Sequence, residues 1–117
     1  MEKEAINRVL VEFYNRVYQD VMIGYLFTPF DREQLILKQL EFTLSIFGKG
    51  VYRGKGLREA HSPLNLRSGH LRRRQVILTQ VLLDLGVPEE FRNHWLKSEE
   101  KVLNQILGST PSCMSPL

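Results

Sequence analysis

Apolar side chains repeat at helical spacing along this chain, and this limits the fold more than any other feature of the sequence. Within residues 4–19 they occur at Ile6, Val9, Leu10, Phe13 and Val17. Intervals of three and four residues put them on one face of a helix. No stretch alternates apolar and polar residues over more than a few positions, as a half-buried strand does. The sequence therefore predicts an all-α fold.

A second helix and a loop follow the first helix. The segment 24–31 breaks the apolar pattern with glycine and proline, and Asp31 is expected to cap a helix that runs to Ile46 or Phe47. Gly48 should end it. Residues 48–56, which include Gly48 itself, contain four glycines in nine positions, which favours a loop. A short helical turn is expected at about 57–61, before Pro63.

Two further helices complete the expected fold. Ser68 should cap a helix that runs to Leu85 and stops at Gly86. Pro88 suits the first turn of a last helix, which should end near Gly108. Its expected inward residues are Phe91, Trp95, Val102 and Ile106. Periodicity alone leaves a plain bundle and a globin-like arrangement equally open.

Length and composition fit one compact domain of ordinary soluble type. The chain has 117 residues, 43% of them hydrophobic, and no apolar run reaches the ~18 residues of a membrane span. The first ten residues lack the basic and apolar regions of a secretory signal. The single cysteine, Cys113, has no disulfide partner within the chain, which fits a reducing cytoplasm. We expect a domain at 1–108 and a disordered tail at 109–117.

Three polar side chains fall on apolar faces, where each needs a hydrogen-bond partner. Gln39 lies between Leu35 and Phe42 on the second expected helix, and an unpaired buried amide costs about 1–3 kcal/mol. It must bond internally or face something bound. Tyr14 lies at the flank of the first helix's inward face, and His61 shares an apolar stripe. Each has a structural interpretation, but together they also suit a haem site, which needs one iron-binding histidine and opposing hydrogen-bond donors.

Arg72, Arg73 and Arg74 form the only dense cationic run in a chain of formal net charge +3. Three consecutive helical residues spread over ~200° of the circumference, so they make a poor phosphate-binding face. A solvated face is the preferred interpretation, and no nucleic-acid partner is expected. The alternative function is a haem-free helical interaction module that binds an acidic partner through this arginine-rich helix.

The order and spacing of several motifs resemble the group I truncated haemoglobins, shortened globins built as a two-over-two helical sandwich around haem. EAINRVLVEFYNRV, at 4–17, is similar to the family's opening helix. LKQLEF, at 37–42, is similar to the distal helix, and VYRGKGLREAH, at 51–61, to the segment that ends in the proximal histidine. The similarity covers about residues 4–107. It implies a globin-like fold that lacks most or all of the first globin helix.

The resemblance also implies which residues form the site. His61 maps to the proximal histidine that binds the iron of haem b, and Gln39 to the distal glutamine. Tyr14 and Gln39 would hydrogen-bond the ligand. Phe27 falls where the family has a phenylalanine that packs on the haem. The other expected haem contacts are Leu35, Lys38, Leu57 and Leu66, with Ala60 and Leu64 also on the proximal side.

Lys38 has three interpretations. It is a solvated lysine beside the apolar surface, a partner of a haem propionate, or a sixth iron ligand, as certain family members have at this position. The sequence also departs from the family pattern. The usual second Gly-Gly pair is here Gly48-Lys49-Gly50, and Leu71 stands where an aromatic residue is common.

The activity that the resemblance implies is reversible binding of O2, NO and CO. The reaction most often implied is conversion of NO to nitrate, followed by reduction from an outside electron source. The chain contains no flavin or pyridine-nucleotide motif, so an NO dioxygenase would need a partner reductase. Oxygen storage or sensing would use the same pocket.

Overall fold

The computed structural model describes residues 1–48 and 67–108, and all regular structure within these ranges is helical. The all-α prediction is confirmed. The elements are α1 (Lys3–Gln19), α2 (Gly24–Phe27), α3 (Arg32–Ile46), α5 (Ser68–Asp84) and α6 (Glu89–Gly108). The predicted glycine-rich loop, the helical turn at 57–61 and the tail at 109–117 lie outside the described residues. In the described part, no helix combines the length and the apolar character needed to cross a membrane.

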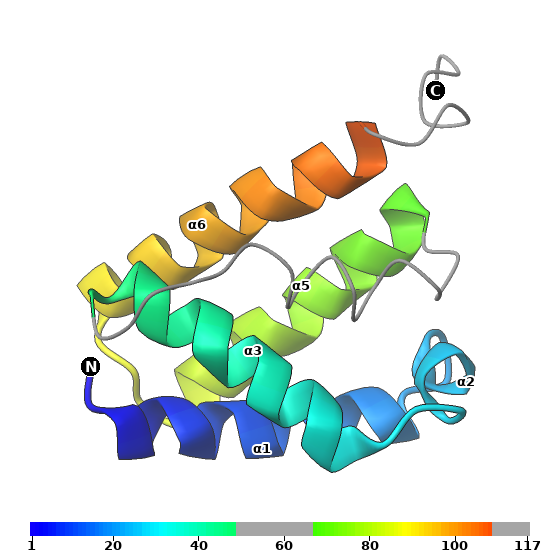
Figure 1. Ribbon diagram of the computed structural model, residues 1–117, viewed down its shortest axis with the longest axis horizontal. Coiled ribbons are helices and arrows are strands. Elements are labelled where there is room, and N and C mark those ends of the chain that lie inside the picture. The colour runs from blue at the N-terminus through cyan, green and yellow to red at the C-terminus, as the bar shows by residue number, and fades with distance from the viewer. Residues whose placement is uncertain (49–66, 109–117) are drawn as a thin grey trace.

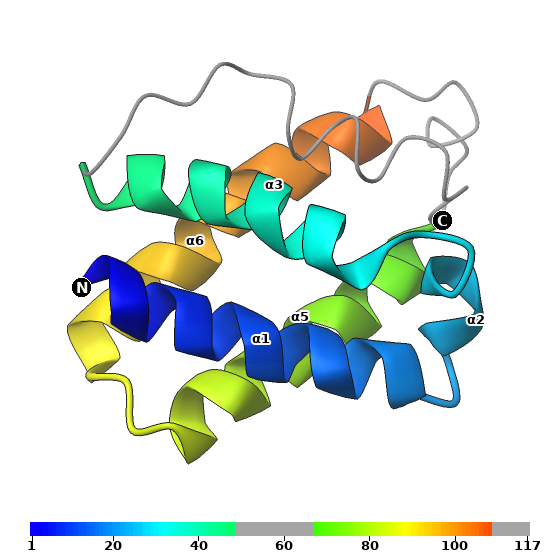
Figure 2. The same cartoon turned by 60° about the horizontal axis from the view of Figure 1, so that its bottom comes forward.

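The long helices form two pairs that face each other. α1 packs against α3 and α5 packs against α6, while α1 also contacts α5 and α3 also contacts α6. Figure 2 shows the α1–α3 pair in front of the α5–α6 pair. α2 lies at the end of the molecule where the chain passes from α1 to α3 (Figure 1). This is the two-over-two arrangement that the resemblance implies.

The main core fills the space between the two pairs. The predicted apolar face of α1 is confirmed, because Ile6, Val9, Leu10, Phe13 and Val17 are all buried. They pack with Leu78, Val81 and Leu82 of α5 and with Trp95 of α6. A second, smaller apolar cluster joins Phe42 of α3, Leu71 of α5 and Leu103 of α6. Four polar or charged side chains are also buried in the described part: Gln39, Thr43, Arg74 and Glu99.

Several predicted helix ends are confirmed. The Asp31 side chain accepts a hydrogen bond from the backbone N–H of Glu33 at 3.2 Å and caps α3. Gly48 and Gly86 follow the ends of α3 and α5 with φ values of 72° and 71°. Glycine adopts this left-handed conformation without the steric cost that a Cβ atom brings.

Two predicted helix starts need correction by one residue. Ser68 is the first residue of α5 rather than its cap, which is Arg67. The backbone N–H of Arg67 donates to Nδ1 of His70 at 3.1 Å, so the imidazole satisfies a donor at this end. Pro88 lies just before α6 rather than in its first turn, and its carbonyl accepts from the Arg92 N–H at 2.9 Å.

The short helix α2 was not predicted, because the contacts that stabilise it come partly from another helix. Asp20 accepts hydrogen bonds from the backbone N–H groups of Met22 and Ile23, each at 3.0 Å. Its other oxygen accepts from Arg73 of α5 at 2.6 Å. The Arg73 hydrogen bond is the main cause that lowers the pKa of the Asp20 carboxyl. This ion pair ties the α1–α2 corner to α5.

Gly24 is required where α2 meets α1. A Cβ atom at this position would lie 2.9 Å from the carbonyl oxygen of Tyr18 and 3.1 Å from that of Val17. Backbone atoms cannot rotate away, so we expect Gly24→Ala to lower the free energy of unfolding by about 1–3 kcal/mol. Urea denaturation measures the loss. Gly69→Ala is the matched control, because nothing lies within 4 Å of a Cβ there; equal losses in both variants would contradict the prediction.

Candidate functional site

The structure brings together several of the predicted site residues and leaves others untested. Tyr14 of α1 and Gln39 of α3 are each 1% exposed. Leu35 and Phe27 are buried as well, whereas Lys38 is half-buried on α3. Three predicted haem contacts and two further proximal residues lie outside the described residues: His61, Leu57, Leu66, Ala60 and Leu64.

Gln39 bonds to side chains of three helices. Its Nε2 donates to Oε2 of Glu99 at 2.6 Å and to Oγ1 of Thr43 at 3.3 Å. Its Oε1 accepts from Nη2 of Arg74 at 3.4 Å. The reverse orientation of the amide would put its oxygen against a carboxylate and its NH2 group against a guanidinium, so the charges determine which end points where. The glutamine is therefore bonded internally, one of the two outcomes that its position allowed.

Arg74 and Glu99 form a buried ion pair at the centre of this network. Nη1 of Arg74 lies 2.7 Å from Oε1 of Glu99, and the two side chains are 2% and 1% exposed. Trp95 donates its indole N–H to Oε2 of Glu99 at 3.0 Å. Nη1 of Arg74 also donates a hydrogen bond to Oε1 of Gln75. One carboxylate thus accepts from three side chains.

This pair corrects the prediction of a solvated arginine face. Of the three consecutive arginines, Arg74 is buried and Arg73 binds Asp20, which leaves Arg72 exposed. The reason is the ~200° spread of three adjacent helical residues, which sends one of them inward. An acidic partner that binds this face would therefore contact much less positive charge than three exposed arginines would provide.

The Tyr14 hydroxyl belongs to the same buried cluster. Burial raises the pKa of Tyr14 to about 12, although the charge and hydrogen bonding of Arg74 oppose the shift. The phenol is therefore protonated at neutral pH and able to donate. Its ring makes an edge contact with Phe13, with centroids 4.9 Å apart. The Arg74 guanidinium lies 4.8 Å from the centroid of Phe13, which adds a cation–π contact.

Arg74 also carries an unsatisfied donor. Its Nε is the one buried side-chain nitrogen or oxygen in the described part without a hydrogen-bond partner. Burial disfavours the charge of Arg74, but the electrostatic and hydrogen-bonding effects of Glu99 and Tyr14 together outweigh it, and the pKa of the guanidinium is raised. The Arg74 side chain is therefore a permanent cation, and its Nε–H group has no acceptor.

The two histidines in the described part, His70 and His94, have structural roles. Nδ1 of His70 accepts from the Arg67 N–H at 3.1 Å. Nε2 of His94 lies 2.8 Å from the carbonyl oxygen of Ile46 and so links α6 to the end of α3. Its ring also packs edge-on against Phe47, with centroids 5.3 Å apart.

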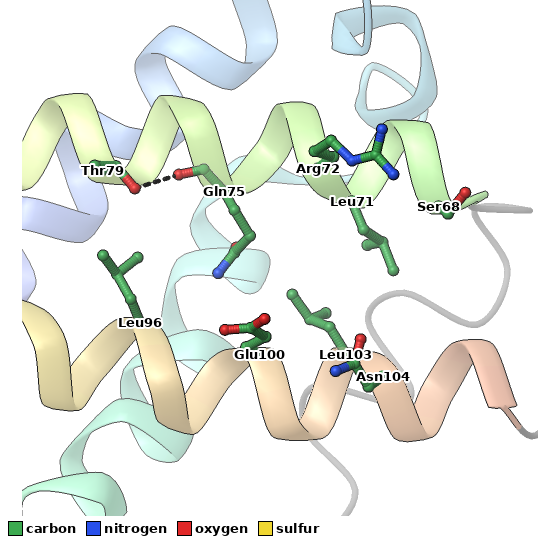
Figure 3. A pocket seen from close by; sticks show the side chains of 9 residues that line it. All are labelled: Ser68, Leu71, Arg72, Gln75, Thr79, Leu96, Glu100, Leu103 and Asn104. Carbon is green, nitrogen blue, oxygen red and sulfur yellow. Dashed lines mark hydrogen bonds between the residues drawn. The ribbon is translucent and has the colours of Figure 1, made fainter.

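A groove of about 480 Å³ lies between α5 and α6. Figure 3 shows Leu71 and Leu103 facing each other across it, with Gln75 and Glu100 farther along. Among the described residues, none of the predicted site residues lines the groove. Gln75 connects the two regions, because it lines the groove and accepts a hydrogen bond from Arg74.

Sequence reasoning missed Arg74 and Glu99, although a periodic signal for both was present. Glu99 lies four residues after Trp95 and four before Leu103, so it continues the inward stripe of α6. Arg74 lies three residues after Leu71 and four before Leu78 on α5. Each is a charge at an apolar position, and two such charges of opposite sign on different helices indicate a buried pair.

A model of the bacterial-like globins matches residues 2–107. The chain belongs to the bacterial-like globin family. Among its relatives, the group 1 truncated hemoglobin of Tetrahymena pyriformis is 28% identical over 107 residues, which cover 91% of this chain and 88% of the relative. That of Tetrahymena thermophila is 28% identical over 105 residues, which cover 89% and 87%.

These comparisons confirm the resemblance to truncated haemoglobins and indicate a haem-binding globin. The described residues fit such a cofactor in their chemistry. Tyr14, Gln39 and the unsatisfied Nε of Arg74 are buried polar groups. The smaller apolar cluster of Phe42, Leu71 and Leu103 consists of side-chain types that commonly line a cofactor pocket.

Proposed function

We propose that this globin binds O2, NO and CO reversibly, with haem b held by His61 and the ligand contacted by Tyr14. The observation that carries the proposal is the Tyr14 phenol, which is buried beside the cationic Arg74 and is protonated at neutral pH. A buried neutral donor of this kind can hydrogen-bond a small ligand in a site from which water is excluded. The family match gives the cofactor for which such a donor is suited.

His61 is the proposed iron ligand, and the other histidines support this choice. His70 bonds the start of α5, and His94 bonds the end of α3. Haem iron requires one strong protein ligand, and a histidine supplies it in globins. Haem bound through His61 would supply the ferrous iron at which diatomic ligands bind. Leu57, Ala60, Leu64 and Leu66 would contact the proximal side.

The proposed roles of Tyr14 and Gln39 differ. Tyr14 would donate its hydroxyl hydrogen to the ligand. Both N–H groups of Gln39 are bonded to Glu99 and Thr43, so Gln39 would orient its neighbours rather than donate. This refines the expectation that both side chains donate.

We further propose that the oxygenated protein converts NO to nitrate. One NO, one O2 and one electron give one nitrate ion, so each turnover requires an electron from an external reductase. The buried donor Tyr14 would retain O2 until NO arrives. Turnover of NO by the oxygenated protein distinguishes this activity from storage or sensing. A cytoplasmic location would give access to such a reductase.

The visible spectrum of the purified protein tests the proposed function. A haem globin is red and changes its spectrum between the ferric, ferrous and CO-bound forms. A haem-free interaction module stays colourless even after haem is added. The same spectra report whether the iron has five or six ligands.

Tyr14→Phe should speed the release of O2. If the lost hydrogen bond contributes roughly 1–3 kcal/mol, the dissociation rate rises about 5- to 150-fold. Stopped-flow release measures the rate. Tyr18→Phe is the matched control, because the Tyr18 hydroxyl donates instead to the Phe30 carbonyl at 2.7 Å. A Tyr14→Phe rate within about twofold of wild type would remove Tyr14 from this role.

Lys38→Ala tests the proposal of a sixth iron ligand. Lys38 is half-buried and adjacent to Gln39 on α3. If its amine binds iron, the ferric and ferrous spectra of the variant change to those of a five-coordinate or water-bound iron. An unchanged spectrum would exclude iron ligation and leave a propionate partner or a solvated lysine. Lys97→Ala, at an exposed position on α6, is the control.

A further inference from the structure

We propose that the buried Arg74–Glu99 ion pair positions the ligand-binding groups of this globin and directs positive charge toward the bound ligand. The inference rests on the proposed function, because it concerns the same site. It adds two residues, one from α5 and one from α6, to the ligand-contacting groups Tyr14 and Gln39, which lie on α1 and α3. Arg74 and Glu99 act here through Tyr14 and Gln39.

Glu99 determines what Gln39 can do. At 2.6 Å, the carboxylate holds one amide hydrogen, and the Thr43 hydroxyl takes the other at 3.3 Å. Charge-assisted hydrogen bonds of this kind are short and strong. With both donors occupied, Gln39 offers only its carbonyl oxygen, and that oxygen accepts from Arg74. The amide is therefore fixed in one orientation by the ion pair.

Arg74 determines the charge near Tyr14. At the phenol, the electrostatic effect of the Arg74 cation exceeds that of the Glu99 anion. The ion pair is therefore neutral as a whole but presents its positive end to Tyr14. O2 gains negative charge on binding to ferrous iron, whereas CO gains much less. A positive potential should therefore favour O2 over CO.

The guanidinium is held from several directions, which gives the charge a fixed position. Glu99, Gln75 and Gln39 accept from its two terminal nitrogens, and the Phe13 ring lies 4.8 Å from its carbon. Its Nε is left without a partner. Fixed donors act on a ligand without reorganisation, which makes them more effective than mobile ones.

Two variants with opposite expected effects test the proposal in the haem-loaded protein. Arg74→Met with Glu99→Leu removes both charges, so O2 release should be about fivefold faster or more, and the stretching frequency of bound CO should rise. Glu99→Gln keeps the guanidinium and removes its counter-charge. O2 release should then be about fivefold slower or more, and the CO frequency should fall. If the ion pair had only a structural role, the two variants would not shift the O2 release rate and the CO stretching frequency in opposite directions.

The haem-free protein provides a second readout. The side-chain amide hydrogens of Gln39 should exchange slowly with water in the wild type, because the amide is buried and bonded. They should exchange at least about tenfold faster in the double variant. Arg73→Met is the matched control, since Arg73 is adjacent on α5 but binds Asp20 at the α1–α2 corner. It should leave both readouts unchanged.

The outcomes separate this inference from the proposed function. If the wild-type chain binds no haem, the proposed function fails, and the amide exchange alone still tests whether the pair orients Gln39. If haem binds but both variants release O2 at the wild-type rate, or both shift in one direction, the positioning inference is overturned and the proposed function stands. If Glu99→Gln does not fold, the double variant still tests the inference, which requires its O2 release to be faster and its CO stretching frequency to be higher than in the wild type.

Discussion

Replacing His61 with alanine should abolish stable haem binding. On the proposed function, His61 provides the single protein bond to iron, and the described histidines are engaged with the backbone of α3 and of residue 67. Apolar contacts alone would retain a porphyrin weakly. We expect the haem content per chain to fall at least about tenfold, which corresponds to a loss of roughly 1.4 kcal/mol or more. Absorbance of the haem band against total protein measures this content.

Controls make the His61 result specific. His70→Ala and His94→Ala should keep their haem, although each removes a hydrogen bond at a helix end. Free imidazole added to His61→Ala should restore haem binding, because it can occupy the space left by the side chain and bind iron. Full haem retention in His61→Ala, with an unchanged spectrum, would show that another group binds the iron.

The fold was predictable where local pattern and tertiary packing agree. α1 and α3 have the expected bounds within one residue. The apolar stripe alone indicates the limits of α1, whereas α3 also has the capping residue Asp31 and the terminating residue Gly48. α2 was missed because the Asp20 carboxylate that organises its start is held by Arg73, 53 residues away. The start of α5 differs by one residue because the His70 ring bonds the Arg67 N–H.

The candidate site was predictable only in part, for a similar reason. Tyr14 and Gln39 are uncharged polar residues on apolar faces, so periodicity alone marks them as buried and in need of partners. Arg74 and Glu99 are residue types that are rarely buried unless paired. Arg74 and Glu99 are 25 residues apart in sequence, and they lie on different helices. Periodicity indicates that each points inward, but only the fold shows that they meet.

Glu99→Leu should be among the most destabilising single substitutions in this chain. It leaves the Arg74 guanidinium buried at 2% exposure with no counter-charge, and it removes the acceptor of the Trp95 and Gln39 N–H groups. Removing one partner of a buried ion pair costs about 3–5 kcal/mol. Urea unfolding of the haem-free protein should show this loss. Measuring without haem avoids the stabilisation that cofactor binding adds.

The double variant Arg74→Met with Glu99→Leu should recover most of that loss. Two apolar side chains of similar volume remove both desolvated charges at once, and such replacements are often neutral or stabilising. Arg74→Met alone should cost less than Glu99→Leu, because a carboxyl group can take up a proton when its partner is lost, whereas a guanidinium stays charged. Arg73→Met, which breaks a partly exposed pair, should cost at most about 1 kcal/mol. Additive losses in the double variant would contradict the coupling, since independent sites add and coupled ones do not.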